Sequence, residues 1–180
     1  LSRLLMKSKD FKSPTIVIIT DRTDLDSQLS ELFLKSKTYI GDNSIENIES
    51  RKLLGEKLRD RQSGGVFLTT IQKFCEDTKL LSDRSNIICI SDEAHRSQNN
   101  LEEKLFVNDE KGIVEHKFGF AKFLHDSLPN ATYVGFTGTP IDMKDKSTIE
   151  VFGKYIDIYD MTQAVDDGAT VPIYYENRTA

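Results

Sequence analysis

The chain has 180 residues, of which 38% are hydrophobic and 29% charged, as is typical of one globular domain with a single core. Its formal net charge of −5 and its pI of about 5.3 exclude the strongly basic surface of many nucleic-acid-binding domains. Only a narrow strip of phosphate contacts remains possible. Apolar runs such as 16–19 and 87–90 are far shorter than the roughly 20 residues of a membrane helix, so we expect no membrane partner and a cytoplasmic protein.

Four short apolar runs are predicted to be strands of one sheet. Their hydrophobic residues follow one another without alternation, which predicts burial on both faces. The predicted strands span 15–20, 65–70, 86–91 and 131–136.

Helices are predicted between these strands, because apolar residues recur there at helical spacing. The expected helices span Thr23 to Ser36, Ser44 to Asp60 and about Val114 to Ser127, and the polar stretch 99–112 is expected to be an exposed loop. Strands that alternate with helices predict an α/β fold in which helices sandwich a parallel sheet.

Ionisable residues gather directly after the third predicted strand. In open parallel sheets, ligands bind beyond the carboxyl ends of the strands, and Asp92 and Glu93 lie at such an end. Adjacent carboxylates repel one another unless a cation or a partner neutralises them, and Mg²⁺ prefers oxygen ligands. The alternative is a solvated acidic turn that caps a helix.

The two cysteines, Cys75 and Cys89, show no CxxC or Cys/His spacing, which favours free thiols over a zinc site.

The chain resembles superfamily 2 helicases and translocases in four motifs that occur in the order of that family. They are "TDRTDLDSQ" at 20–28 (motif Ia), "TTIQKF" at 69–74 (motif Ib), "DEAH" at 92–95 (motif II) and "TGTP" within 136–140 (motif III). "SDEAHRSQ", "GFTGTPI" and the tail at 152–178 resemble more closely the first RecA-like motor domain of the R subunit of type I restriction endonucleases.

The resemblance implies a Mg²⁺-dependent ATPase site. Asp92 would hold Mg²⁺ through its water shell, and Glu93 would be the catalytic carboxylate that activates the attacking water. His95, Thr137 and Thr139 would connect the nucleotide state to a second motor domain. Gly138 suits a tight turn between the two threonines, because glycine adopts a positive φ and allows close approach of the backbone.

The resemblance also implies contacts with the backbone of double-stranded DNA. Asp21, Arg22, Thr70 and Gln72 occupy the corresponding positions, and hydroxyls and backbone amides bind phosphate without reading sequence. Two simpler roles remain open. Thr70 could be the N-cap of a helix, and Arg22 could pair with Asp24 or Asp26.

The phosphate-binding loop GxxxxGK[ST] does not occur in the sequence, so the chain alone is expected to bind ATP weakly or not at all. Residues 1–9 are expected to be the end of a helix that follows this loop in a longer parent. The expected division is a partial motor domain at 1–160 and a segment at 161–180 that leads toward the second motor domain. The parent is expected to use ATP and Mg²⁺, and to assemble with modification and specificity subunits.

Two other functions remain open on the sequence. The parent could be another superfamily 2 helicase or repair translocase, against which the "AVDDGATVPIYYE" tail argues. It could also be a nucleic-acid-binding module with a degenerate ATPase site, although the DEAH and TGTP motifs are intact.

Overall fold

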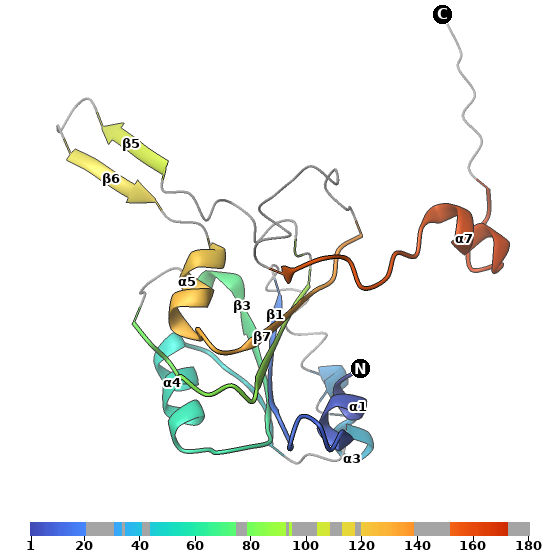
Figure 1. The fold of residues 1–180 in the computed structure, drawn as a ribbon, viewed down its shortest axis with the longest axis horizontal. Helices are drawn as coiled ribbons and strands as arrows, with labels where there is room; N and C mark the ends of the chain where they lie inside the picture. Colours follow the sequence, from blue (N-terminus) through green and yellow to red (C-terminus); the bar gives the residue numbers. More distant parts are fainter. Residues whose placement is uncertain are drawn as a thin grey trace, which may run out of the picture.

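The fold is described from a computed structural model (Figure 1). The described residues are 1–20, 31–33, 35–40, 44–74, 79–92, 94, 104–108, 113–117, 120–138 and 152–172.

The described part of the chain contains a parallel sheet of five strands in the order β2-β3-β1-β4-β7. The strands are β1 (Thr15–Thr20), β2 (Ile45–Asn47), β3 (Val66–Thr70), β4 (Ile87–Ser91) and β7 (Thr132–Gly135). All four pairings are parallel, so the carboxyl ends of the strands lie along one edge of the sheet. The predicted α/β fold with a parallel sheet is confirmed.

Helices cover both faces of this sheet, as Figure 1 shows. The helices α4 (Arg51–Arg59) and α5 (Phe120–Ser127) lie on one face, where Leu54, Leu58 and Leu124 pack into an apolar cluster with β1, β3 and β4. On the other face lie α1 (Ser2–Lys7) and α3 (Lys37–Ile40), and a second cluster there holds Ile40. We call these the α4/α5 face and the α1/α3 face.

The three central strands are buried on both sides, as their unbroken apolar runs predict. Every residue of β1, β3 and β4 is buried. Removal of this apolar area from water contributes about 25 cal/mol per Å², which favours a strand covered on both faces. The prediction is wrong for β7, whose residues are exposed or half-buried, because β7 pairs only with β4 in the described sheet.

The helix predicted from Ser44 to Asp60 begins later than expected. Its first residues form β2, in which Ile45 pairs with Val66 of β3 and is 2% exposed. The α4 helix begins at Arg51, because the side chain of Ser50 caps it by accepting a hydrogen bond of 3.2 Å from the amide of Leu53. The helical spacing of the isoleucines therefore reflects burial in a strand and the turn that follows it.

The region from 99 to 127 also differs from its prediction. Residues that were expected in a loop and at the start of a helix form an antiparallel pair, β5 (Lys104–Asn108) with β6 (Ile113–Lys117), and α5 begins only at Phe120. In the register of this pair Val107 lies opposite Val114. The rest of 99–112 lies outside the described residues.

Helix predictions at the amino end of the chain are confirmed where the structure describes them. The α1 helix lies within 1–9, and its first cap, Leu1, makes no side-chain capping bond. Residues 31–33 and 35 of the helix predicted from Thr23 to Ser36 are helical, and the residues at 23–30 and 34 lie outside the described residues.

Arg84 stabilises the opposite edge of the sheet, where the strands begin, through hydrogen bonds. Its guanidinium donates hydrogen bonds to the carbonyl of Arg61 (2.6 Å), to Thr15 Oγ1 (2.7 Å) and to Asn86 Oδ1 (2.9 Å). Desolvation by burial lowers the pKa of Arg84, and the positive charge of Arg61 lowers it further. These bonds connect the start of β1 and the residue before β4 to Arg61, two residues past the end of α4.

Candidate functional site at the carboxyl ends of the strands

Asp92 continues the backbone ladder of the sheet one residue past the end of β4. Its amide donates a hydrogen bond of 2.9 Å to the carbonyl of Ile19 in β1. This ladder fixes the backbone of Asp92, which is half-buried, at the edge where parallel sheets bind ligands. Glu93 and His95 lie outside the described residues.

The strand register brings three polar side chains into one row on the α1/α3 face. Thr20 is paired with Thr70, and Ile19 is paired with Ser91, which places Thr20 beside Asp92. Side chains alternate along a strand, and Ile18 and Ile90 belong to the cluster on the α1/α3 face. Thr20 follows Ile18 by two residues and Asp92 follows Ile90 by two residues, so both side chains project from the sheet on that same face.

Two buried hydroxyls at this edge have no hydrogen-bond partner in the described structure. They are Thr20 Oγ1 and Ser91 Oγ, and both residues are only 1% exposed. Ser91 follows Cys89, which belongs to the cluster on the α4/α5 face, so its side chain points away from the row of Thr70, Thr20 and Asp92. A buried hydroxyl without a partner costs about 1–3 kcal/mol, and such groups often mark functional sites.

Two backbone hydrogen bonds connect the DEAH segment to motif III. The amide of Phe136 donates to the carbonyl of Ser91 (2.9 Å), and the amide of Ala94 donates to the carbonyl of Phe136 (2.8 Å). Half-buried Thr137 follows directly. The backbone just before Thr137 is therefore held beside Ser91 and Ala94, and Thr139 lies outside the described residues.

Gly135, for which the sequence predicted no role, explains why these segments lie so close together. A Cβ at this position would lie 2.8 Å from the Cβ of Ala94 and 3.1 Å from the ring of Phe152. Only glycine permits this approach. The conformational reason expected for Gly138 is not found, because its φ is not positive and a Cβ there would meet nothing within 4 Å.

The predicted DNA-contact residues are only partly brought together. Thr70 is 2% exposed and ends β3, and Gln72 is exposed in the short 3₁₀ helix η1 (Ile71–Phe74) that follows. Lys73, also in η1, donates a hydrogen bond of 2.6 Å to the carbonyl of Ile48. Asp21 and Arg22 lie outside the described residues.

The composition of this edge fits a hard cation. A carboxylate beside hydroxyls offers oxygen ligands, and Mg²⁺ commonly needs one or two carboxylates because it keeps several waters. Within the part of the chain that the structure describes, no group of three or more His, Cys, Asp or Glu side chains could hold a metal ion.

Comparison with known proteins gives the family. The family model of the SWI2/SNF2 ATPases matches residues 1–180. The chain belongs to the SWI2/SNF2 ATPase family.

Relatives of this SWI2/SNF2 chain are subunits of restriction enzymes. The type I restriction enzyme HindI endonuclease subunit of Haemophilus influenzae is 47% identical over 96% of this chain and 16% of its own length. The putative type I restriction enzyme MjaIXP endonuclease subunit of Methanocaldococcus jannaschii is 39% identical over 96% of this chain and 15% of its own length. The chain thus spans about a sixth of the length of these relatives. The resemblance to the R subunit of type I restriction endonucleases is confirmed.

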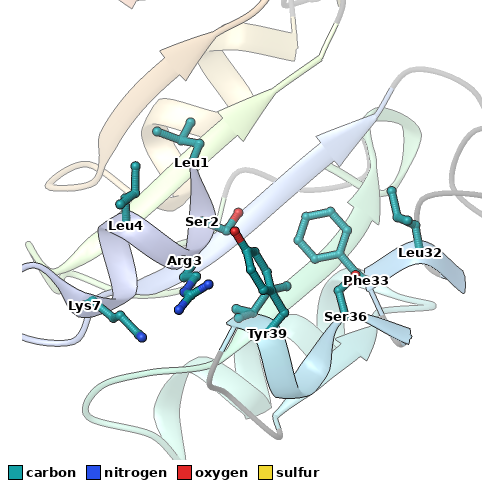
Figure 2. Close-up of a pocket in the computed structure, with 10 residues that line it drawn as sticks. Leu1, Ser2, Arg3, Leu4, Lys7, Leu32, Phe33, Ser36 and Tyr39 are labelled. Carbon is teal, nitrogen blue, oxygen red and sulfur yellow. The ribbon is translucent and has the colours of Figure 1, made fainter.

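A groove on the α1/α3 face of the SWI2/SNF2 chain is distinct from this edge. Figure 2 shows Leu1, the N-cap of α1, and Leu4 of α1 on one side and Phe33 and Tyr39 on the other. The groove has a volume of about 570 Å³, and the guanidinium of Arg3 lies 4.2 Å from the centre of the Tyr39 ring. None of the predicted site residues lines it.

Among the described residues, no helix is both long and apolar enough to span a bilayer.

Proposed function

We propose that this chain is part of the first motor domain of the R subunit of a type I restriction-modification enzyme. The parent would couple ATP hydrolysis to movement of double-stranded DNA, and cleavage of that DNA would follow. The observation that carries the proposal is the 47% identity over 96% of the chain with a type I restriction endonuclease subunit. The position of the DEAH segment at the carboxyl edge of the sheet supports it.

The proposed hydrolysis site consists of Asp92 and Glu93. Asp92 would hold Mg²⁺ through water, and Glu93 would accept the proton of the attacking water. Bound Mg²⁺ would neutralise charge on the phosphates of ATP. The missing phosphate-binding loop would come from a part of the parent outside this chain, so the 180-residue chain alone is expected to show no ATPase activity.

We assign coupling to His95, Thr137, Gly138 and Thr139. The hydrogen bonds from Phe136 to Ser91 and from Ala94 to Phe136 support this role, because they link the ends of β4 and β7. A change in the position of Asp92 would shift motif III, where hydroxyls can exchange partners between nucleotide states.

The proposed DNA contacts are Asp21, Arg22, Thr70 and Gln72. Exposed Gln72 can reach a phosphate, whereas Thr70 would contribute through the backbone at the end of its strand. The parent would act in the cytoplasm with modification and specificity subunits, which would supply recognition of the DNA sequence.

We propose that residues 161–180 lead to a second motor domain, whereas 1–160 belong to the first. The α7 helix (Met161–Asp166) supports this division, because it has a complete capping box, in which Asp160 and Gln163 cap one another, but no buried residue. Near it, Ile156 is 90% exposed and Val171 75% exposed. Ile158, Tyr159 and Met161 are exposed as well, and exposed apolar residues that gather in one segment commonly mark an interface.

The test is the Glu93→Gln substitution in the full-length protein, assembled with its modification and specificity subunits. Loss of a general base lowers turnover by ~10²–10⁴-fold, and displacement of a DNA triplex ahead of the moving motor should stop. Nucleotide binding should persist. The control is Asp126→Asn, which neutralises an exposed carboxylate on α5. Translocation that continues in the Glu93→Gln protein would refute the proposal.

A further inference from the structure

The hydroxyl of Thr20 is the one polar group in the row of Thr70, Thr20 and Asp92 that is both buried and recorded without a partner. Its position beside Asp92 follows from the pairing of Ile19 with Ser91 and from the bond between the Asp92 amide and the carbonyl of Ile19. Neighbouring strands are about 4.8 Å apart, so a threonine hydroxyl lies within reach of a carboxylate on the next strand.

We propose that Thr20 is a positioning residue for the metal site, and that its hydroxyl donates a hydrogen bond to the Asp92 carboxylate when Mg²⁺-ATP is bound. The inference rests on the proposed function, in which Asp92 holds the cation. Thr20 would not touch the metal or the nucleotide. It would fix the direction of the Asp92 carboxylate, through which it acts.

The chemistry of the pair supports this role. A hydroxyl can donate to a carboxylate whose other oxygen faces a metal-bound water, and such supporting bonds orient metal-holding side chains. Threonine is suitable because its branched Cβ restricts the side chain to few rotamers. Thr20 is only 1% exposed, and the apolar residues Ile18 and Ile90 lie on the same face; such low-polarity surroundings strengthen a charge-assisted bond.

Ser91 provides a matched control within the same chain. It is equally buried, its hydroxyl also has no recorded partner in the described structure, and it directly precedes Asp92. Its side chain points to the α4/α5 face, however, so it cannot reach the carboxylate of Asp92. A general effect of removing a buried hydroxyl near the site should therefore appear in both residues, whereas positioning of Asp92 should depend on Thr20 alone.

The experiment measures metal binding without turnover. Mn²⁺ is titrated into the full-length protein with a non-hydrolysable ATP analogue, and free Mn²⁺ is followed by electron paramagnetic resonance. Thr20→Val, which lacks the hydroxyl, should weaken Mn²⁺ binding by ~10-fold, the lower part of the range for supporting groups of metal sites. Thr20→Ser and Ser91→Ala should stay within about twofold of the unchanged protein, since neither removes the proposed bond.

A second measurement uses the 180-residue chain. Because the hydroxyl of Thr20 has no partner in this structure, Thr20→Val should raise the melting temperature of the chain. A lower melting temperature would mean that the hydroxyl has a structural partner, and the inference would be overturned. Equal Mn²⁺ binding by Thr20→Val and the unchanged protein would overturn it as well, as would equal weakening by Ser91→Ala.

Asp92→Asn separates failure of the inference from failure of the proposed function. If this variant binds Mn²⁺ as tightly as the unchanged protein, Asp92 does not hold the cation, and the proposed metal site falls together with the role of Thr20. If Asp92→Asn weakens binding and Thr20→Val does not, only the role of Thr20 is wrong.

Discussion

The polar groups at the two edges of the parallel sheet differ in their hydrogen bonding. At the edge where the strands begin, Thr15 Oγ1 donates to the carbonyl of Gly64 and accepts from Arg84, and Asn86 accepts from Arg84 and donates to the carbonyl of Gln62. At the edge where the strands end, the hydroxyls of Thr20 and Ser91 are buried without a recorded partner in the described structure. The polar groups at the first edge are therefore paired within the fold, whereas two buried hydroxyls beside the DEAH segment are not.

This comparison predicts that activity and stability respond to different edges. The largest effect is expected for Asp92→Asn in the full-length protein, where ATP turnover should fall by ~10²–10³-fold because the proposed holder of Mg²⁺ loses its charge, and with it the cation that would neutralise the phosphates. Unfolding of the 180-residue chain in urea should change by no more than about 0.5 kcal/mol, since Asp92 is only half-buried. A large loss of stability would mean that the carboxyl edge also fastens the fold.

Arg84→Ala should have the reverse effect. It leaves Thr15 Oγ1, Asn86 Oδ1 and the carbonyl of Arg61 without this donor, and should lower the free energy of unfolding by about 3 kcal/mol. Urea denaturation of the 180-residue chain is the measurement. Arg59→Ala is the control, because it removes an exposed arginine from the end of α4 and should cost less than about 0.5 kcal/mol. Equal losses would show that positive charge at this edge matters more than the bonds of Arg84.

Gly135→Ala should disturb the carboxyl edge by steric means. The new Cβ would lie 2.8 Å from the Cβ of Ala94, and overpacking of this kind costs about 1–3 kcal/mol. Chemical denaturation of the 180-residue chain tests this. Gly138→Ala is the matched control, since its Cβ meets nothing within 4 Å and should leave stability unchanged or raise it by about 0.4–1 kcal/mol. If Gly138→Ala were the more damaging of the two, the packing of Gly135 would not be what holds the DEAH segment in place.

Cys89 in β4, between the two edges, should make the free energy of unfolding depend on pH, and this effect is expected to be smaller. Cys89 is a free, buried cysteine, and desolvation raises the pKa of its thiol. As pH rises, the Cys89 thiol therefore loses its proton in the unfolded chain before it does so in the folded chain. The contribution of the buried thiol to stability is complete below the unfolded pKa of about 8.5 and declines as pH rises above that value. The slope for one group is about 1.4 kcal/mol per pH unit.

The measurement is urea unfolding between pH 7 and pH 10 in a Cys75→Ser background, with Cys89→Ala as the comparison. Tyr133 titrates in the same direction at higher pH, because burial raises its pKa and Cys89 raises it further. The Cys89→Ala chain should therefore lose less stability than its parent between pH 8.5 and pH 10. Parallel curves would contradict burial of the thiol.

The sequence predicts those parts of the fold whose signal is local. The runs at 15–20, 65–70 and 86–91 are short, consecutive and rich in β-branched residues, which favours strands covered on both faces. The third run leads directly to Asp92, so the position of the candidate site at the carboxyl edge follows from the sequence. The start of α4 is harder to predict from the sequence. The isoleucines at 45 and 48 fit a helix and a buried strand equally well, and only pairing with β3 decides between them.

The sequence by itself determined four of the five strands of the parallel sheet, the DEAH and TGTP segments, and the family to which the chain belongs. Only the tertiary structure decided that Thr20 lies beside Asp92, that Gly135 lets Ala94 approach β7, and that Arg84 joins the beginnings of β1 and β4 to the segment after α4. The physical reason is that spacing along a chain fixes the face on which a side chain lies, whereas neighbours across a sheet depend on register. Register is set by how the whole core packs.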